Sequence, residues 1–300
     1  MKIVTFNIQF GVGRDDRVDL ARTAAAIADA DIIGLQEVDR HAPRSEYADQ
    51  PAVLGGHFPN HAWVYGPTVD IFDPRAPLSG RRRQFGNMVL SRWPILTSRT
   101  LLYWPKIGGA NHLSLQLGVV ETIVDAPAGP LRVYCTHLHH LSPPLRARQI
   151  DQLLAIVRGA GQEGTVISGA PPDGEWYDGA AGPTVPVEAI LLGDFNLTPD
   201  SDTYTQIVGP RSERGKASNI LGPAGHPRLI ATDGFVDAWV AAGHREEEGV
   251  TAPLLKDRVE EKRIDYGFVT AGLAKRVTRA WIDAETMASD HQPAWFDLDW

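Results

Sequence analysis

The first forty residues alternate between strand-like and helix-like sequence, and this alternation constrains the fold more than any other feature of the chain. Residues 3–10 are β-branched and aromatic, with apolar side chains at nearly every position, which predicts a strand covered on both faces. Residues 18–28 carry apolar side chains at helical spacing, with Asp15 and Asp16 expected at the start of that helix. Residues 32–38 predict a second strand. This order favours an α/β fold over an all-α or all-β fold.

Later segments continue the alternation. Residues 145–157 carry a helical pattern, and Pro143 and Pro144 stand where its first turn is expected. The Gly- and Pro-rich connections near 159–186 and 208–227 predict either functional loops or variable surface excursions. Because candidate site residues occur on both sides of these connections, we expect a single domain over residues 1–300. Further strands are predicted at residues 87–90, 117–124, 131–138, 187–192, 264–270, 277–282 and 294–298.

Charge and cysteine content narrow the class of protein. The chain has 29 basic and 37 acidic residues, a formal net charge of −8, so we expect no stable complex with nucleic acid, although a local basic cleft is compatible with this balance. No run approaches the roughly 18 apolar residues that span a bilayer. The start of the sequence lacks the pattern of a secretory signal, and the lone Cys135 excludes an internal disulfide. We therefore expect a cytoplasmic protein, and the sequence leaves its oligomeric state open.

The most informative segment is residues 191–196, with the sequence LLGDFN. An apolar strand ends there and presents Asp194 and Asn196 two positions apart, so both side chains can reach one site while Phe195 turns into the core. A carboxylate beside a carboxamide offers oxygens for a hard cation or an activated water, and donors for a phosphate oxygen. The alternative is a turn that these side chains cap.

Two further segments place a carboxylate near a histidine. Asp290 and His291 follow Ser289 directly before the last predicted strand, and they share a site only if the chain turns there. Upstream, Asp265 opens a predicted strand and could accept a hydrogen bond from a histidine ring, which would fix its tautomer and favour the charged imidazolium. Taken singly, each residue is also compatible with an ordinary surface role.

Polar residues also interrupt or end the other predicted strands. Asn7 interrupts the first strand, and Glu37 ends the second, where neighbouring parallel strands gather ligands in α/β proteins. Glu37 is therefore a candidate cation ligand, the alternative being a carboxylate that simply meets solvent. A third strand ends in His137, followed by His139 and His140. We favour a proton donor or phosphate contact at His137 over a zinc site, because cysteine ligands and a helical histidine pair are missing.

Taken together, these motifs resemble the endonuclease/exonuclease/phosphatase superfamily. Each motif is weak alone, but seven in this order at sensible distances, over residues 3–298, make a strong resemblance. They are Asn7, Gln36-Glu37, Gly86-Asn87, Thr136-His137-Leu138, Gly193-Asp194-Phe195-Asn196, Arg263-Ile264-Asp265-Tyr266 and Ser289-Asp290-His291.

The resemblance implies a four-layer αββα sandwich, in which two mixed β-sheets pack face to face with helices outside. It also implies a divalent-metal site at one edge of the sheets, with Glu37 as the main ligand and Asn7 and Asp290 completing the coordination. Mg²⁺ suits this chemistry because it is a hard cation that takes few protein carboxylates and keeps waters, and Mn²⁺ is a possible substitute.

The same resemblance assigns catalytic roles. Asp194 is expected to orient or deprotonate the attacking water, and Asn196 to hold a phosphate oxygen. His291 is expected to contact the scissile phosphate while Asp265 holds its ring.

Two more positions bind the phosphate in this scheme. Asn87 is expected to lie beside it, and His137 to act as a second catalytic histidine that contacts it. The deoxyribonuclease and sphingomyelinase branches carry histidine at the position of His137, whereas AP endonucleases carry tyrosine, which argues against repair of abasic sites.

The function that follows is a Mg²⁺-dependent hydrolase of phosphodiester bonds, acting on nucleic acid, a phospholipid head group or a small diester by in-line attack of water. One alternative is a phosphomonoesterase acting on a polyphosphorylated small molecule. Another is a noncatalytic binding protein, which is disfavoured because Glu37, Asp194 and His291 are all retained.

The substrate is less well defined by the sequence. Residues 81–83 are three consecutive arginines, which predict either contacts to additional phosphates or a solvated edge. Trp63, Tyr65, Trp104 and Trp176 are expected in or beside loops, where they would either stack on a base or lipid head group or be partly buried.

Overall fold

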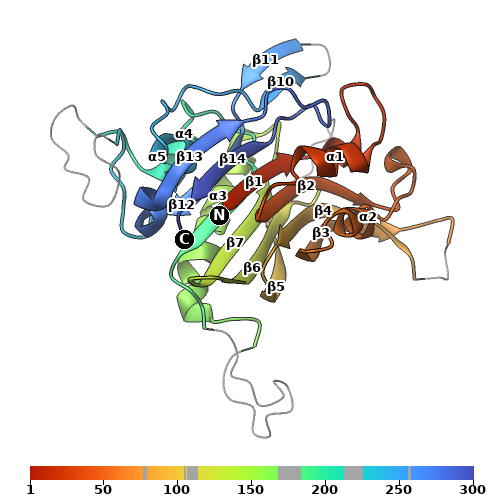
Figure 1. Cartoon of the computed structure of the whole chain (residues 1–300), viewed down its shortest axis with the longest axis horizontal. Coiled ribbons are helices and arrows are strands. Elements are labelled where there is room, and N and C mark those ends of the chain that lie inside the picture. Colours follow the sequence, from red (N-terminus) through yellow and green to blue (C-terminus); the bar gives the residue numbers. More distant parts are fainter. Residues whose placement is uncertain (77–79, 105, 107–113, 168–183, 213–225, 256–257) are drawn as a thin grey trace, which may run out of the picture.

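Two six-stranded sheets form the centre of the protein in the computed structural model, which describes residues 1–76, 80–104, 106, 114–167, 184–212, 226–255 and 258–300 (Figure 1). The first sheet has the order β13 (Val277–Ile282), β14 (Ala294–Leu298), β1 (Lys2–Asn7), β2 (Ile32–Arg40), β4 (Arg82–Ser91) and β3 (Ala62–Phe72). The second has the order β5 (Ile95–Leu102), β6 (Gly118–Ala126), β7 (Gly129–His137), β8 (Ala189–Asp194), β12 (Asp265–Thr270) and β9 (Phe235–Asp237). β10 (Ala252–Leu255) and β11 (Arg258–Lys262) form a separate hairpin.

Both sheets are mixed, as predicted. In the described part of the chain β1 pairs with β2, and β7 with β8, in parallel, while the remaining neighbours pair antiparallel. Parallel β1 and β2 are joined through α1 (Leu20–Ala26), and parallel β7 and β8 through α3 (Pro143–Glu163). Each such connection brings two strands to an end at the same edge of its sheet.

Three apolar clusters separate the layers of the sandwich. One lies between the sheets and joins Ile3 of β1 to Ile190 of β8. A second packs the outer face of the first sheet against α1 and α2 (Gln50–His57), with Leu20 and Leu54 buried. A third packs the outer face of the second sheet against α3 and α4 (Asp202–Val208). The predicted four-layer αββα sandwich is therefore confirmed.

The start of the chain differs from the prediction in two details. β1 ends at Asn7 rather than at residue 10, because a short 3-10 turn η1 (Gln9–Gly11) follows with Phe10 at φ 54°. The cap of α1 is Asp19, which accepts a hydrogen bond from the backbone N–H of Arg22, rather than Asp15 or Asp16. Asp15 instead pairs with the guanidinium of Arg22 at 2.9 and 3.0 Å.

The predicted helix after Pro143 and Pro144 is confirmed, and it is longer than predicted. Ser142 caps α3, and the helix continues to Glu163 because its apolar face still buries Ala160. Residues 159–163 therefore belong to a helix, which corrects the predicted loop near 159–186. Residues 168–183, including Trp176, and residues 213–225 lie outside the described residues.

Five strands escaped the sequence analysis: β3, β5, β9, β10 and β11. The two longest, β3 and β5, lie at sheet edges and are only half-buried. β3 carries Trp63 and Tyr65, which are therefore strand residues rather than loop residues, and the Tyr65 hydroxyl donates to the Val38 carbonyl. β5 is the other edge strand, and Trp104 beyond it is 78% exposed. Among the described residues no helix is long and apolar enough to cross a membrane.

Candidate active site

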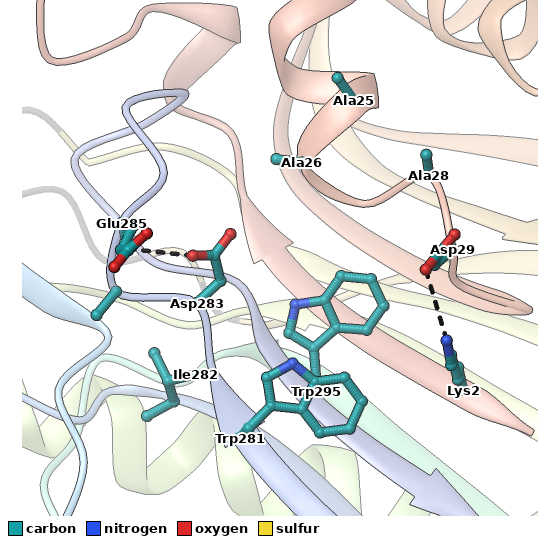
Figure 2. Close-up of a pocket in the computed structure, with 11 residues that line it drawn as sticks. Lys2, Ala25, Ala26, Ala28, Asp29, Trp281, Ile282, Asp283, Glu285 and Trp295 are labelled. Carbon is teal, nitrogen blue, oxygen red and sulfur yellow. Dashed lines mark hydrogen bonds and ion pairs between the residues drawn. The ribbon is translucent and has the colours of Figure 1, made fainter.

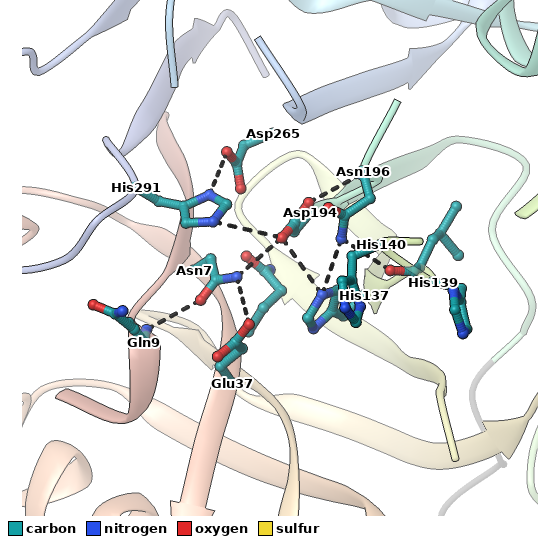
Figure 3. Close-up of polar contacts among 12 residues, drawn as sticks. Asn7, Gln9, Glu37, His137, His139, His140, Asp194, Asn196, Asp265 and His291 are labelled. Atoms are coloured by element: carbon teal, nitrogen blue, oxygen red, sulfur yellow. Dashed lines mark hydrogen bonds and ion pairs between the residues drawn. The ribbon is translucent and has the colours of Figure 1, made fainter. Parts of the chain in front are cut away.

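The site residues gather where strands of both sheets end. In the second sheet Asp194, the last residue of β8, pairs in register with His137 on β7 and with Asp265 on β12. In the first sheet Asn7 ends β1 in register with Gln36 of β2. β2 continues to Arg40, so Glu37 lies within this strand, and the prediction that Glu37 ends it is wrong. The two groups meet because the sheets pack face to face, as Figure 3 shows.

A distortion of β2 directs Glu37 toward this meeting point. The register of β2 with β4 shifts between Leu35 and Val38, which marks a bulge, and Glu37 has φ 60°. Such a backbone is costly for a residue with a side chain and persists where the surroundings impose it, as they do at functional sites. Gln36 beside it is fully buried, and its amide nitrogen lies 3.1 Å from the sulfur of Cys135 in the opposite sheet.

Asn7 joins the carboxylates of the two sheets. Its Nδ2 donates to Oε1 of Glu37 at 3.1 Å and to Oδ2 of Asp194 at 2.9 Å. Its Oδ1 accepts from the backbone N–H of Gln9 at 3.0 Å, so the amide is held in one orientation. Two carboxylates from different sheets therefore converge on a single neutral donor (Figure 3).

His291 is held by the predicted carboxylate. Its Nδ1 lies 2.8 Å from Oδ2 of Asp265, and its Nε2 lies 3.8 Å from Oδ2 of Asp194. The turn that this segment requires is made by Ser289, whose hydroxyl donates to the Asn7 carbonyl at 2.8 Å and accepts from the backbone N–H of His291 at 3.1 Å. The end of β1 and the segment before β14 are thereby fixed to each other.

The structure of residues 194–196 agrees with both interpretations of their sequence, a shared polar site and a turn capped by side chains. Oδ1 of Asp194 accepts from the backbone N–H of Asn196 at 3.0 Å, which is a side-chain-capped turn, while Oδ2 faces Asn7. The Asn196 amide nitrogen lies 3.1 Å from Nε2 of His137 and donates to the Leu138 carbonyl at 3.0 Å. Phe195 is fully buried, as predicted.

Burial and opposite charge shift the protonation of the site in different directions. Burial raises the pKa of Glu37, and the nearby His137 and Asn7 reduce that rise. Burial also raises the pKa of Asp265 to about 6. Burial alone would lower the pKa of His291, but the carboxylates of Asp265 and Asp194 outweigh it and raise that pKa well above its usual value. His291 and Asp265 therefore form an imidazolium–carboxylate pair near neutral pH.

The donor set fits a hard divalent cation. Asp194, Asp265 and His291 bring potential ligand atoms within 4.8 Å of one another, and Glu37 adds an oxygen from the first sheet. Oδ1 of Asp265 is buried and accepts no hydrogen bond from the described residues. Carboxylate oxygens crowded in this way are what Mg²⁺ or Mn²⁺ selects. His291 already donates to Asp265, whereas the Glu37 and Asp194 oxygens face the shared donor Asn7.

Not every predicted residue joins this network. The Asn87 amide nitrogen is buried and lies 3.2 and 3.4 Å from the carbonyls of Gly118 and Cys135, so it links the two sheets. Asp290 is half-buried and accepts from the Ser289 hydroxyl at 3.2 Å. His139 accepts two backbone N–H groups directly before α3.

Two residues near the site were not predicted. The buried Thr251 hydroxyl accepts from the backbone N–H groups of Ile264 and Asp265 at 3.0 and 3.1 Å, which fixes the start of β12. Phe85 of β4 lies beside the His137 ring, with ring centroids 6.4 Å apart. Neither Thr251 nor Phe85 belongs to a recognisable sequence motif. Each makes its contact with a segment that is distant in the sequence, so sequence reasoning had no signal for it.

Two hollows among the described residues, of about 690 and 700 Å³, lie away from this network. The hollow of about 690 Å³ lies beside α1 and β13, where Trp281 stacks on Trp295 (Figure 2). None of the predicted site residues lines it. The site is therefore identified by its polar contacts rather than by the size of a cavity.

Comparison with known proteins bears on the fold and the family of the chain. The sequence profile of the Endonuclease/Exonuclease/phosphatase family matches residues 4–291. Similar solved structures include an endonuclease/exonuclease/phosphatase from Beutenbergia cavernae (TM-score 0.63, 22% identity, covering 99% of this chain and 71% of that one). They also include a mannosyl-6-phosphatase of Bacteroides thetaiotaomicron (0.57, 15%, 100% of both chains) and truncated TDP2 of Caenorhabditis elegans (0.58, 17%, 98% and 96%). The comparison with curated proteins gave no match.

Proposed function

The chain belongs to the endonuclease/exonuclease/phosphatase family, and from that premise we propose that it is a Mg²⁺-dependent phosphodiesterase. The observation that carries the proposal is the convergence of Glu37, Asp194 and His291 from three distant segments on one point, bridged by Asn7. Acidic oxygens interleaved with nitrogen donors match the needs of a metal-bound phosphoryl group.

Glu37 would be the main ligand of the cation, supported by Asn7 and by Asp290 at the rim. When bound, Mg²⁺ would neutralise charge on the phosphoryl oxygens and on the leaving oxygen. The bulge in β2 supports this role of Glu37, because it presents the carboxylate opposite Asp194 rather than toward solvent.

The remaining groups would act on the water and the phosphate. Asp194 would orient or accept a proton from the attacking water, since its Oδ2 lies among Asn7, His137 and His291. Asn196 and His137 would donate to phosphoryl oxygens, with Nδ1 of His137 buried and without a partner among the described residues. His291, charged beside Asp265, would stabilise the charge that develops on the phosphate.

The test is a substrate panel with Mg²⁺, Mn²⁺ or EDTA, using bis-4-nitrophenyl phosphate, supercoiled DNA, RNA, sphingomyelin and phosphate monoesters. We expect metal-dependent cleavage of at least one diester. Release of inorganic phosphate from monoesters alone would favour the phosphomonoesterase alternative. Absence of any metal effect on any substrate would leave only a binding role.

Matched variants connect the activity to the site. Asp194→Ala and His291→Ala should lower turnover at least about a hundredfold in folded protein. Asp125→Ala and His57→Ala, at exposed positions on β6 and α2, serve as controls and should keep it. Turnover close to wild type in either site variant would contradict the assignment.

A further inference from the structure

An apolar groove adjoins the site on the side of the first sheet. It has a volume of about 310 Å³ and is lined by Pro43, Val69, Ile71, Phe85 and Leu115; we call it the Phe85 groove. Ile71 is 52% exposed, so the strand presents an apolar side chain to solvent here. Apolar walls with a few fixed polar groups are typical of ligand sites.

Phe85 links the groove to the catalytic residues, because it lines the groove and lies beside the His137 ring. Phe85 is buried and lies between two aromatic rings, with centroid separations of 6.4 Å to His137 and 6.4 Å to Phe10. Nε2 of His137 belongs to the polar network through Asn196. A ligand with its phosphoryl group at His137 would therefore have the apolar wall directly beside it.

A fixed cation borders the same wall. The Arg44 guanidinium pairs with both oxygens of the buried Asp39 at 2.9 Å and lies 3.5 Å from the centre of the Phe10 ring. It also lies 5.2 Å from the Phe85 ring centre. The ion pair with Asp39 fixes the orientation of the Arg44 guanidinium. Because 42% of the Arg44 side chain stays exposed, the guanidinium remains accessible beside the groove.

One residue of the arginine run, Arg83, also lines the groove and adds a second guanidinium to its border. Arg82 pairs with Asp70, whereas Arg81 and Arg83 both lie against the buried Asp73, at 2.8 and 3.6 Å. Arg75 approaches the same carboxylate at 3.2 Å, so three guanidiniums surround one anion. The groove thus combines an apolar wall with a positive border, which complements an anion that carries an apolar group.

We propose that the Phe85 groove is a specificity subsite for a compact apolar group on the phosphoric ester. Its volume lies near the low end of the roughly 300–1,000 Å³ found for ligand pockets, which suits one ring or a short branched alkyl group rather than a long acyl chain. This inference rests on the proposed function, because it assumes that the phosphoryl group binds at His137.

Binding of phosphonates tests the subsite without requiring turnover. Methylphosphonate, benzylphosphonate and cyclohexylmethylphosphonate would be titrated calorimetrically into the full chain with MgCl₂. We expect at least one of the two larger ligands to bind about tenfold more tightly than methylphosphonate. The benzyl and cyclohexylmethyl arms distinguish a flat ring from a branched alkyl group.

One substitution and a matched control locate the effect. Ile71→Thr keeps a β-branched residue on β3 but removes a methyl group and replaces a methylene by a hydroxyl. It should reduce the preference by at least about fourfold, the value of one buried methylene group. Phe72→Thr changes the next residue of the strand, which is 55% exposed and points to the opposite face, so the preference should be retained.

The outcomes separate the two proposals. Equal binding of the three phosphonates, no binding of any, or a preference that Ile71→Thr leaves intact would overturn the subsite. If the preference and its dependence on Ile71 are found but no ester is hydrolysed, the proposed function is wrong and the groove remains a binding site. If diesters are hydrolysed while the phosphonates bind equally, only the subsite fails.

Discussion

Replacing Asp265 and His291 by asparagine, singly and together, tests whether the buried pair acts as a unit. Asp265→Asn keeps an oxygen that can accept from Nδ1 of His291, now 2.8 Å away, but it removes the negative charge. His291→Asn keeps an N–H donor for Asp265 and removes the imidazole. Each variant therefore changes the chemistry of the pair while leaving a hydrogen bond in the core.

The expected magnitude follows from the contact. A hydrogen bond to a charged group contributes about 1.5–3 kcal/mol, against about 0.5–1.5 kcal/mol for a neutral one, so Asp265→Asn loses at least about 1 kcal/mol. Full charges about 4 Å apart interact by about 4 kcal/mol at an effective dielectric constant of 20, which sets the upper bound. We therefore expect kcat/KM to fall between about fivefold and about a thousandfold. Loss of the imidazole in His291→Asn should cost about 10²–10⁴-fold.

The double variant Asp265→Asn/His291→Asn tests whether Asp265 acts through His291. If Asp265 acts through His291, the double variant should be no slower than His291→Asn alone, and the coupling energy equals the whole loss caused by Asp265→Asn. The assay is kcat/KM for bis-4-nitrophenyl phosphate with excess MgCl₂, with urea unfolding of each variant as a control. Losses that multiply in the double variant would refute the paired action, as would Asp265→Asn with wild-type kcat/KM.

Three further results follow from the structure. EDTA should abolish hydrolysis, and Mg²⁺ or Mn²⁺ should restore it; activity that survives EDTA would contradict the metal role. Phe195→Ala removes a buried ring packed edge-on against Tyr266 and should lower the free energy of unfolding by about 3–5 kcal/mol in urea titrations, whereas a loss below about 1 kcal/mol would contradict the packing. Although burial opposes it, hydrogen bonds from Arg75 and Arg81 lower the pKa of Asp73 to about 2. Its stabilisation is thus present above about pH 4 and lost as the pH falls toward 2, so the urea midpoints of wild type and Asp73→Asn should differ at pH 6 and converge over that range.

Much of the fold could be predicted because its central strands are buried on both faces. The central strand β14 has the predicted bounds, and the start of α3 follows from its two prolines. β13 has the predicted bounds too, although it is a partly exposed edge strand. The edge strands β3 and β5 could not be predicted, since they face solvent along much of their length and lack a continuous apolar run. Their pairing depends on neighbours that are distant in the sequence.

The candidate site was predictable as a set of residue types, and its geometry was not. The pattern around Asp194 and Asn196 indicated one site with Phe195 in the core, and the structure has this arrangement. The positive φ of Glu37 leaves no mark in the sequence, because the bulge arises from the pairing of β2 with β4. The metal, catalytic and phosphate roles of all these residues, including Asp290 and Asn87, stay predictions.

The bridge from Asn7 to Asp194 spans 187 residues and two separate sheets. A partly folded chain in which only one sheet has formed possesses half of the reacting groups and none of their spacing. Recovery of turnover during refolding would therefore report the docking of the sheets, a later event than the return of strand content. A shift of one sheet against the other by a fraction of the spacing between residues would abolish turnover, although the strands of both sheets would stay formed.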